Sequence, residues 1–183
     1  MRKKWLALAL SLTMVAGCLT GCGGSDSTTS NTNSGSSSND SAKVETLADG
    51  GGKVLNIYVW NDEFSSRFEK YYPDYDKSTK SIGDVKVNFI QNANEGNNYQ
   101  DKLDAALKAQ DSASADDKVD MFLCEMDYVN KYTNTDKAVD VKALGLTDDD
   151  MSQMYDYTKQ AATGVDGVLR GVSWQGCPGV LFY

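Results

Sequence analysis

The chain has 183 residues, four cysteines, no histidine and a formal net charge of −8. The negative charge argues against nucleic acid as a partner and against docking on anionic lipid headgroups. Without histidine or a CxxC pair, the usual ligand sets for zinc are missing, and no DxDxDG spacing indicates a calcium loop. No glycine-rich phosphate loop follows a predicted strand, which leaves a nucleotide site without support. We therefore expect no metal and no cofactor.

Residues 1–21 have the order of a secretory signal, with basic residues at 2–4, an apolar run over 5–19 and small residues up to Cys22. Polar residues interrupt the run, and a membrane-spanning helix needs about 20 apolar residues. The segment resembles a bacterial lipoprotein signal, in which the cysteine becomes the lipid-modified first residue. Cys18 also fits that pattern, but Cys22 is preferred because the polar segment starts directly behind it. The resemblance implies an acyl-anchored protein on the outer face of the cytoplasmic membrane.

Residues 22–52 are read as the lipidated cysteine and a disordered tether rich in Gly, Ser, Asn and Thr. Such a segment cannot bury enough apolar surface to offset the entropy of ordering it. Removal of the signal, which carries three basic residues and no acidic one, changes the formal charge to −11. Cys124 and Cys177 remain, and one disulfide between them is left open. The folding part is 53–183, a single small domain by length.

The first half of this domain alternates strand and helix patterns. Strands are expected over 53–60, 85–89 and 118–123, followed by helices over about 62–72, 98–107 and 128–132. Pro73 ends the first helix, and Asn61 or Asp62 is expected to cap it. This order predicts an open α/β fold, a mainly parallel sheet flanked by helices.

The second half carries weaker signals. Thr147 and Asp150 resemble a capping box, and Met151, Met154, Tyr155 and Thr158 would share one face of a helix over 151–158. Asp148, Asp149 and Asp150 are interpreted as charge at that helix start and not as a metal site. The Asp-Gly pair at 166–167 predicts a hairpin turn, with further strands over 171–175 and 178–183.

Ligands of open α/β sheets bind at the carboxyl ends of the strands. That rule selects the loops 60–63, 92–97 and 125–127, which are rich in amide, carboxylate and aromatic groups. Aromatic faces stack on sugar rings, and carboxylates and amides take paired hydroxyls. The candidate ligand-binding residues are Trp60, Asn61, Asp62, Glu63, Asn94, Asn97, Glu125, Trp174 and Gln175.

Most candidates have a structural alternative. Either tryptophan fits a core position, and the polar residues at 61–63 fit helix capping, worth about 0.5–2 kcal/mol. Asn94 and Asn97 fit solvated loop positions, and Asp127 is interpreted as the cap of the next helix.

Five segments, in order behind the lipoprotein signal, carry a family resemblance over essentially the whole chain. They are 54–64, 98–103, 119–123, 166–175 and 178–183. Together they resemble the amino-terminal lobe of an extracellular solute-binding protein of an ABC importer, in the carbohydrate-binding group related to maltose-binding protein. The resemblance implies lobe 1 of a type II periplasmic-binding-protein fold. That group has two lobes and about twice this length, so we expect an incomplete lobe, a fragment or truncated product.

The resemblance further implies a non-enzymatic lipoprotein that delivers a sugar or oligosaccharide to the permease subunits of an importer. Binding of a peptide or another polar solute by the same fold is an alternative. A surface glycan hydrolase is a second alternative, with Asp62 or Glu63 paired to Glu125. It would need two carboxylates about 5–5.5 Å or 6.5–9.5 Å apart, and no glycosidase motif is present.

Overall fold

The computed structural model describes residues 50–176. The signal, Cys18, Cys22, Cys177, nearly all of the tether and the predicted strand over 178–183 lie outside the described residues. The elements in chain order are β1 (Val54–Val59), α1 (Glu63–Tyr71), β2 (Tyr75–Asp76), β3 (Ser81–Ile82), β4 (Val85–Gln91), η1 (Glu95–Asn97), α2 (Asn98–Ala109), η2 (Gln110–Ser112), η3 (Ala115–Asp117), β5 (Met121–Phe122), α3 (Asn130–Thr133) and α4 (Asp156–Ala161).

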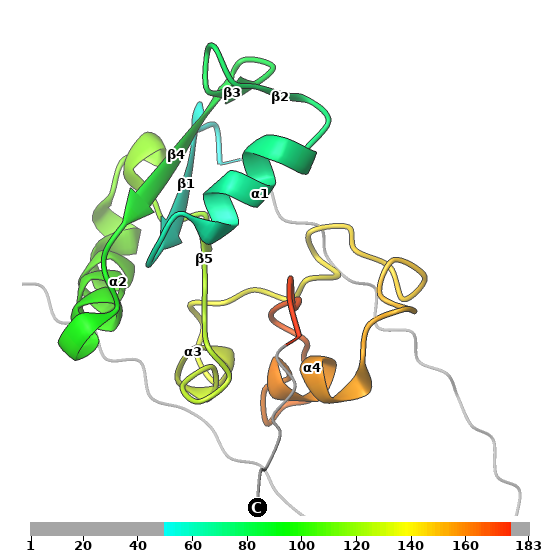
Figure 1. The fold of residues 1–183 in the computed structure, drawn as a ribbon. Helices are drawn as coiled ribbons and strands as arrows, with labels where there is room; N and C mark the ends of the chain where they lie inside the picture. Colours follow the sequence, from blue (N-terminus) through cyan, green and yellow to red (C-terminus); the bar gives the residue numbers. More distant parts are fainter. Residues whose placement is uncertain (1–49, 177–183) are drawn as a thin grey trace, which may run out of the picture. The chain divides into compact units, whose positions relative to one another are not determined.

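The strands form one five-stranded sheet in the order β2-β3-β4-β1-β5 (Figure 1). The central strand β1 runs parallel to both neighbours, with Ile57 opposite Phe89 on β4 and Met121 on β5. The predicted open α/β sheet is therefore confirmed, although the sheet is mixed, with two parallel and two antiparallel strand pairs among the described residues. The antiparallel β2–β3 hairpin, which extends the sheet beyond β4, was not predicted because each of its strands has only two residues.

The alternating side chains of β1 pack on two separate cores, since successive residues of a strand point to opposite faces. Ile57 and Val59 are fully buried in a cluster that includes Phe64 and Phe68 of α1. On the other side, Tyr58 packs on a cluster built by three buried residues of α2: Tyr99, Leu103 and Leu107. The helices α1 and α2 thus cover opposite faces of the sheet, as Figure 1 shows.

Asn56 is the exception among the apolar residues of β1. It is only 3% exposed, yet its amide nitrogen donates to the carbonyls of Asp116 at 2.8 Å and Lys118 at 2.9 Å. Its side-chain oxygen accepts from Asn88 Nδ2 at 2.8 Å. One buried side chain therefore joins β1 to β4 and to the segment that leads into β5, with its polar atoms satisfied.

The predicted third strand, 118–123, is shorter in the structure. Only Met121–Phe122 forms a ladder with β1, although Leu123 N still donates to Tyr58 O at 3.1 Å. Earlier in the segment, the side chain of Gln110 pairs with both backbone groups of Val119 at 2.9 Å. A side-chain amide takes the place of a strand partner there, which explains the shortened strand.

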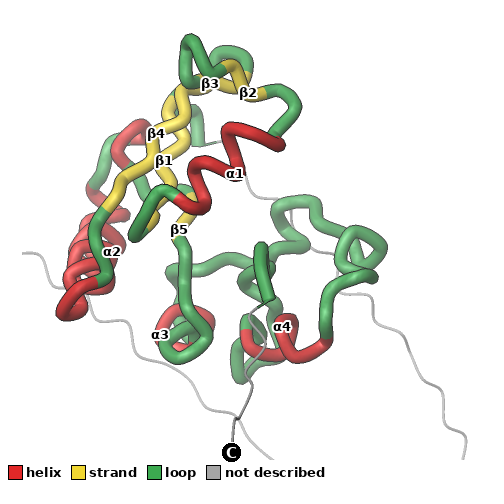
Figure 2. The backbone as a smooth tube through the Cα atoms, viewed as in Figure 1, coloured by secondary structure: helices red, strands yellow, loops and turns green. Residues whose placement is uncertain are grey.

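Two predictions for the second half are wrong. Residues 134–155 form turns and loops (Figure 2), and the helix expected from 151 begins only at Asp156. Thr147 and Asp150 do form the reciprocal hydrogen bonds of the predicted box, but these close a turn. Residues 171–175 form no strand. The hairpin turn is confirmed by the antiparallel bridge between Thr163 and Leu169.

Candidate functional site

The carboxyl ends of β4, β1 and β5 meet at one edge of the sheet. Because the three strands are parallel and in register, Val59 at the end of β1 lies opposite Gln91 at the end of β4. Tyr58 likewise lies opposite Phe122, the last residue of β5. The loops that follow these strands therefore leave the sheet side by side. We call this region, formed by loops 60–63, 92–97 and 123–127, the carboxyl edge.

Asn94 and Glu125 are in direct contact at the carboxyl edge. Asn94 Nδ2 donates to Glu125 Oε2 at 3.0 Å, a hydrogen bond between the loops after β4 and β5. Asn94 is half-buried and Glu125 is exposed. A carboxylate accepts through two oxygens, so Glu125 keeps acceptor capacity beyond this bond. The predicted convergence of these two loops is confirmed.

Trp60 directly follows β1, which lies between β4 and β5 in the sheet. The loops after those two neighbouring strands carry Asn94 and Glu125. Its indole is half-buried and packs against both core clusters. The ring of Tyr99 meets it edge to face, with centroids 5.4 Å apart and planes at 89°. Trp60 thus combines a fixed orientation with partial exposure, the combination that a stacking surface requires.

The residues after Trp60 begin α1, and the structure assigns them different local roles. Asn61 Oδ1 accepts from Glu63 N at 3.0 Å, so Asn61 satisfies a free N–H of the first turn. Asp62 occupies the cap position without a side-chain capping bond. Glu63 forms an ion pair with Arg67 at 3.0 Å, one turn further along the helix. Asn61 thus supports the helix start from the position before the cap, and Asp62 remains an exposed carboxylate.

Trp174 lies against the start of α1. Its ring meets Phe64 edge to face with centroids 5.4 Å apart, and the Arg67 guanidinium lies 5.7 Å from its centroid. Glu63 and Trp174 are therefore brought together through their shared neighbour Arg67. Gln175 is exposed, and its carbonyl accepts from Ser173 Oγ at 2.6 Å.

Asn97 and Asp127 have plainer positions. Asn97 is exposed and precedes α2 with φ at 65°, in the left-handed region that asparagine tolerates better than most residues. The prediction that Asp127 caps the next helix is wrong, because Val129 holds the cap position of α3. A turn from Glu125 O to Tyr128 N takes up the residues between.

Cys124 lies directly before Glu125 and is a free thiol in the structure. Burial raises the pKa of this thiol to about 12, and the nearby charge of Lys131 opposes the shift only in part. The thiol therefore stays protonated near neutral pH. A nucleophilic role is disfavoured, because the thiolate is the reactive form.

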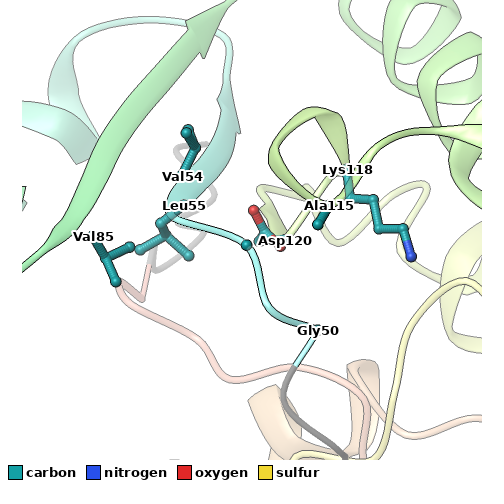
Figure 3. A pocket seen from close by; sticks show the side chains of 8 residues that line it. Gly50, Val54, Leu55, Val85, Ala115, Lys118 and Asp120 are labelled. Carbon is teal, nitrogen blue, oxygen red and sulfur yellow. The ribbon is translucent and has the colours of Figure 1, made fainter.

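A cavity of about 210 Å³ lies at the other end of the parallel strands, where β1 and β4 begin (Figure 3). Val54 and Val85, which line it, are the first residues of β1 and β4. Asp120 also lines it, and desolvation raises the pKa of this carboxyl, against the hydrogen bond from Asn56 N at 2.8 Å. Lys118 is the other charged residue of the lining, which is otherwise apolar. None of the predicted ligand-binding residues lines this cavity.

Two contributors to the carboxyl edge were missed by sequence reasoning. Tyr99 is not among the predicted binding residues, yet its hydroxyl contacts the backbone of β1 and of the segment after β5. Arg67 had no assigned role. Its spacing of four residues from Glu63 is the signal that predicts their ion pair.

No family model, no curated protein and no solved structure matches this chain. Over residues 50–176, no helix is long and apolar enough to cross a membrane. In the same range, no group of three or more histidine, cysteine or acidic side chains is placed to hold a metal ion.

Proposed function

We propose that this chain is part of a non-enzymatic solute-binding lipoprotein that captures a sugar or oligosaccharide for an ABC importer. It would act on the outer face of the bacterial cell membrane, anchored through acylated Cys22. The finer fold assignment, lobe 1 of a type II periplasmic-binding-protein fold, belongs to the same proposal. The described sheet supports it in coarse form, as an open α/β sheet with helices on both faces.

The observation that carries the proposal is the hydrogen bond between Asn94 and Glu125 at 3.0 Å, beside β1, the strand that Trp60 directly follows. Three adjacent loops thereby present an amide, a carboxylate and an indole. Sugar recognition uses these groups together, because the polar groups take hydroxyls while the ring covers the apolar face of the sugar.

Binding is tested by calorimetry of the full-length protein against a broad panel of glycans, with peptides as a second panel. Saturable heat with a glycan is expected, and Trp60→Ala or Glu125→Gln should weaken binding by roughly tenfold, about 1.4 kcal/mol. Glu69→Gln is the matched control, since it removes the same charge from α1 away from the carboxyl edge. No heat with any glycan would contradict the proposal, and heat only with peptides would support the alternative solute.

The same incubations separate binding from hydrolysis. A binding protein leaves the glycan intact, whereas a hydrolase releases reducing ends. Release that disappears in Glu125→Gln would establish the enzyme alternative.

The anchor is tested separately by metabolic labelling with a fatty acid that carries an alkyne. Label should be lost in Cys22→Ser and kept in Cys18→Ser. The reverse pattern would move the anchor to Cys18, and an unlabelled wild-type protein would contradict the lipoprotein assignment.

A further inference from the structure

Tyr99 joins α2 to the two strand ends that lead into the carboxyl edge. The residue is 0% exposed. Its hydroxyl lies 2.7 Å from Leu123 O and 3.1 Å from Tyr58 O, and it shares the Leu123 N–H, at 3.1 Å, with Tyr58 O. A hydroxyl has one proton, so we assign the donated bond to the nearer oxygen, Leu123 O.

The two backbone positions that Tyr99 touches are each two residues before a candidate binding residue. Tyr58 precedes Trp60, and Leu123 precedes Glu125. The same ring also meets the Trp60 indole edge to face at 5.4 Å. The buried side chain of Tyr99 thus contacts the backbone that leads to Trp60 and the backbone that leads to Glu125.

We infer that Tyr99 is a positioning residue for the proposed solute site, whose hydroxyl holds the chain after β5 so that Glu125 stays in reach of Asn94. This inference rests on the proposed function. The ring alone would serve the core equally well as phenylalanine, so the hydroxyl is the atom that distinguishes positioning from packing. Burial raises the pKa of Tyr99 further above its ordinary value, so the hydroxyl keeps its proton.

The first test needs no ligand. In Tyr99→Phe the ring contact with Trp60 is kept, while Leu123 O loses its side-chain donor. Amide hydrogen exchange over 123–126 should become roughly tenfold faster, as expected for the loss of a buried bond worth about 1.4 kcal/mol. Tyr132→Phe is the matched control. That tyrosine belongs to the same buried cluster, but its hydroxyl donates to Asp104 at 3.1 Å, away from the strand ends.

Unchanged exchange over 123–126 in Tyr99→Phe would overturn the inference. An equal acceleration in Tyr132→Phe would also overturn it, because the effect would then be a general loosening of the cluster.

The second test is a double-mutant cycle in glycan binding with Tyr99→Phe and Glu125→Gln. If Tyr99 acts through Glu125, each single variant weakens binding by roughly tenfold and the double variant is no weaker than Glu125→Gln alone. Additive effects would show that Tyr99 acts independently of Glu125. A wild-type protein that binds no glycan would contradict the proposed function, while the exchange experiment would still decide the positioning role.

Discussion

The indole of Trp174 lies edge-on against the ring of Phe64, with centroids 5.4 Å apart and planes at 84°. The two residues are far apart in the sequence, yet Trp174 packs against the same cluster as β1. The contact fixes the segment after the hairpin onto α1. It also shows that a tryptophan selected as a ligand-stacking candidate has a structural role of its own.

We predict that Trp174→Ala lowers the free energy of unfolding by about 1–3 kcal/mol. The substitution removes a half-buried aromatic pair, and loss of the pair adds about 0.5–1.5 kcal/mol to the loss of buried area. Urea denaturation measures the change. Val172→Ala is the control, because Val172 is 46% exposed in the same segment. Equal effects of the two substitutions would contradict a packing role for Trp174.

A second prediction concerns the buried amide of Asn56. Asn56→Ala should lower the free energy of unfolding by about 2–4 kcal/mol, because it leaves the carbonyls of Asp116 and Lys118 without their donor. Asn88→Ala is the comparison variant, since Asn88 is exposed and its loss leaves one buried acceptor, Asn56 Oδ1, without its donor, where Asn56→Ala leaves two. Asn88→Ala should therefore cost less than Asn56→Ala, about 1–2 kcal/mol. A similar loss in both variants would show that the bonds of Asn56 to η3 and Lys118 contribute little.

Much of the first half of the fold could be predicted from the sequence, because its elements carry strong local patterns. The strand over 53–60 and the helix before Pro73 correspond closely to β1 and α1. The predictions for the second half failed where tertiary contacts override local sequence patterns. Met151 is 4% exposed while Tyr155 is 71% exposed. The spacing of apolar residues over 151–158 therefore does not correspond to one buried helical face.

The candidate site could be predicted only in part, for a similar reason. The rule that parallel strands end at a common edge correctly placed Asn94 near Glu125. It could not place Trp174 on α1, since nothing in the local sequence around 174 encodes that partner. An asparagine in the middle of an apolar strand, such as Asn56, is a signal that could have indicated a buried polar network.

A third prediction concerns Gly164, which packs against α3 without space for a side chain. A Cβ at this position would lie 2.5 Å from the backbone oxygen of Thr133, far inside any allowed contact. Gly164→Ala should therefore destabilise the protein by about 1–3 kcal/mol, as overpacking does. Gly171→Ala is the matched control, because its Cβ would meet only Ala162 Cβ at an ordinary 3.5 Å. Thermal unfolding of the two variants tests the difference, and equal melting temperatures would contradict it.

The last prediction is a pH dependence from Asp166 and Arg170. Arg170 donates to both carboxylate oxygens of Asp166, at 2.8 and 2.7 Å, and these hydrogen bonds lower the pKa of Asp166 to about 2. The folded value lies below the ordinary value of 3.8, so the stabilisation is fully present above about pH 4. It is lost as the pH falls through about 2.

Urea denaturation between pH 6 and pH 2 measures this loss. Asp166→Asn should be less stable than the wild type at pH 6, and the difference should shrink steadily below pH 4. Asp136→Asn is the control, because the Asp136 carboxylate is 85% exposed and its nearest cation, Lys137, is 3.7 Å away. The contrary result would be a difference in unfolding free energy between wild type and Asp166→Asn that stays constant down to pH 2. It would show that the ion pair between Asp166 and Arg170 does not contribute to stability through the charge of the carboxylate.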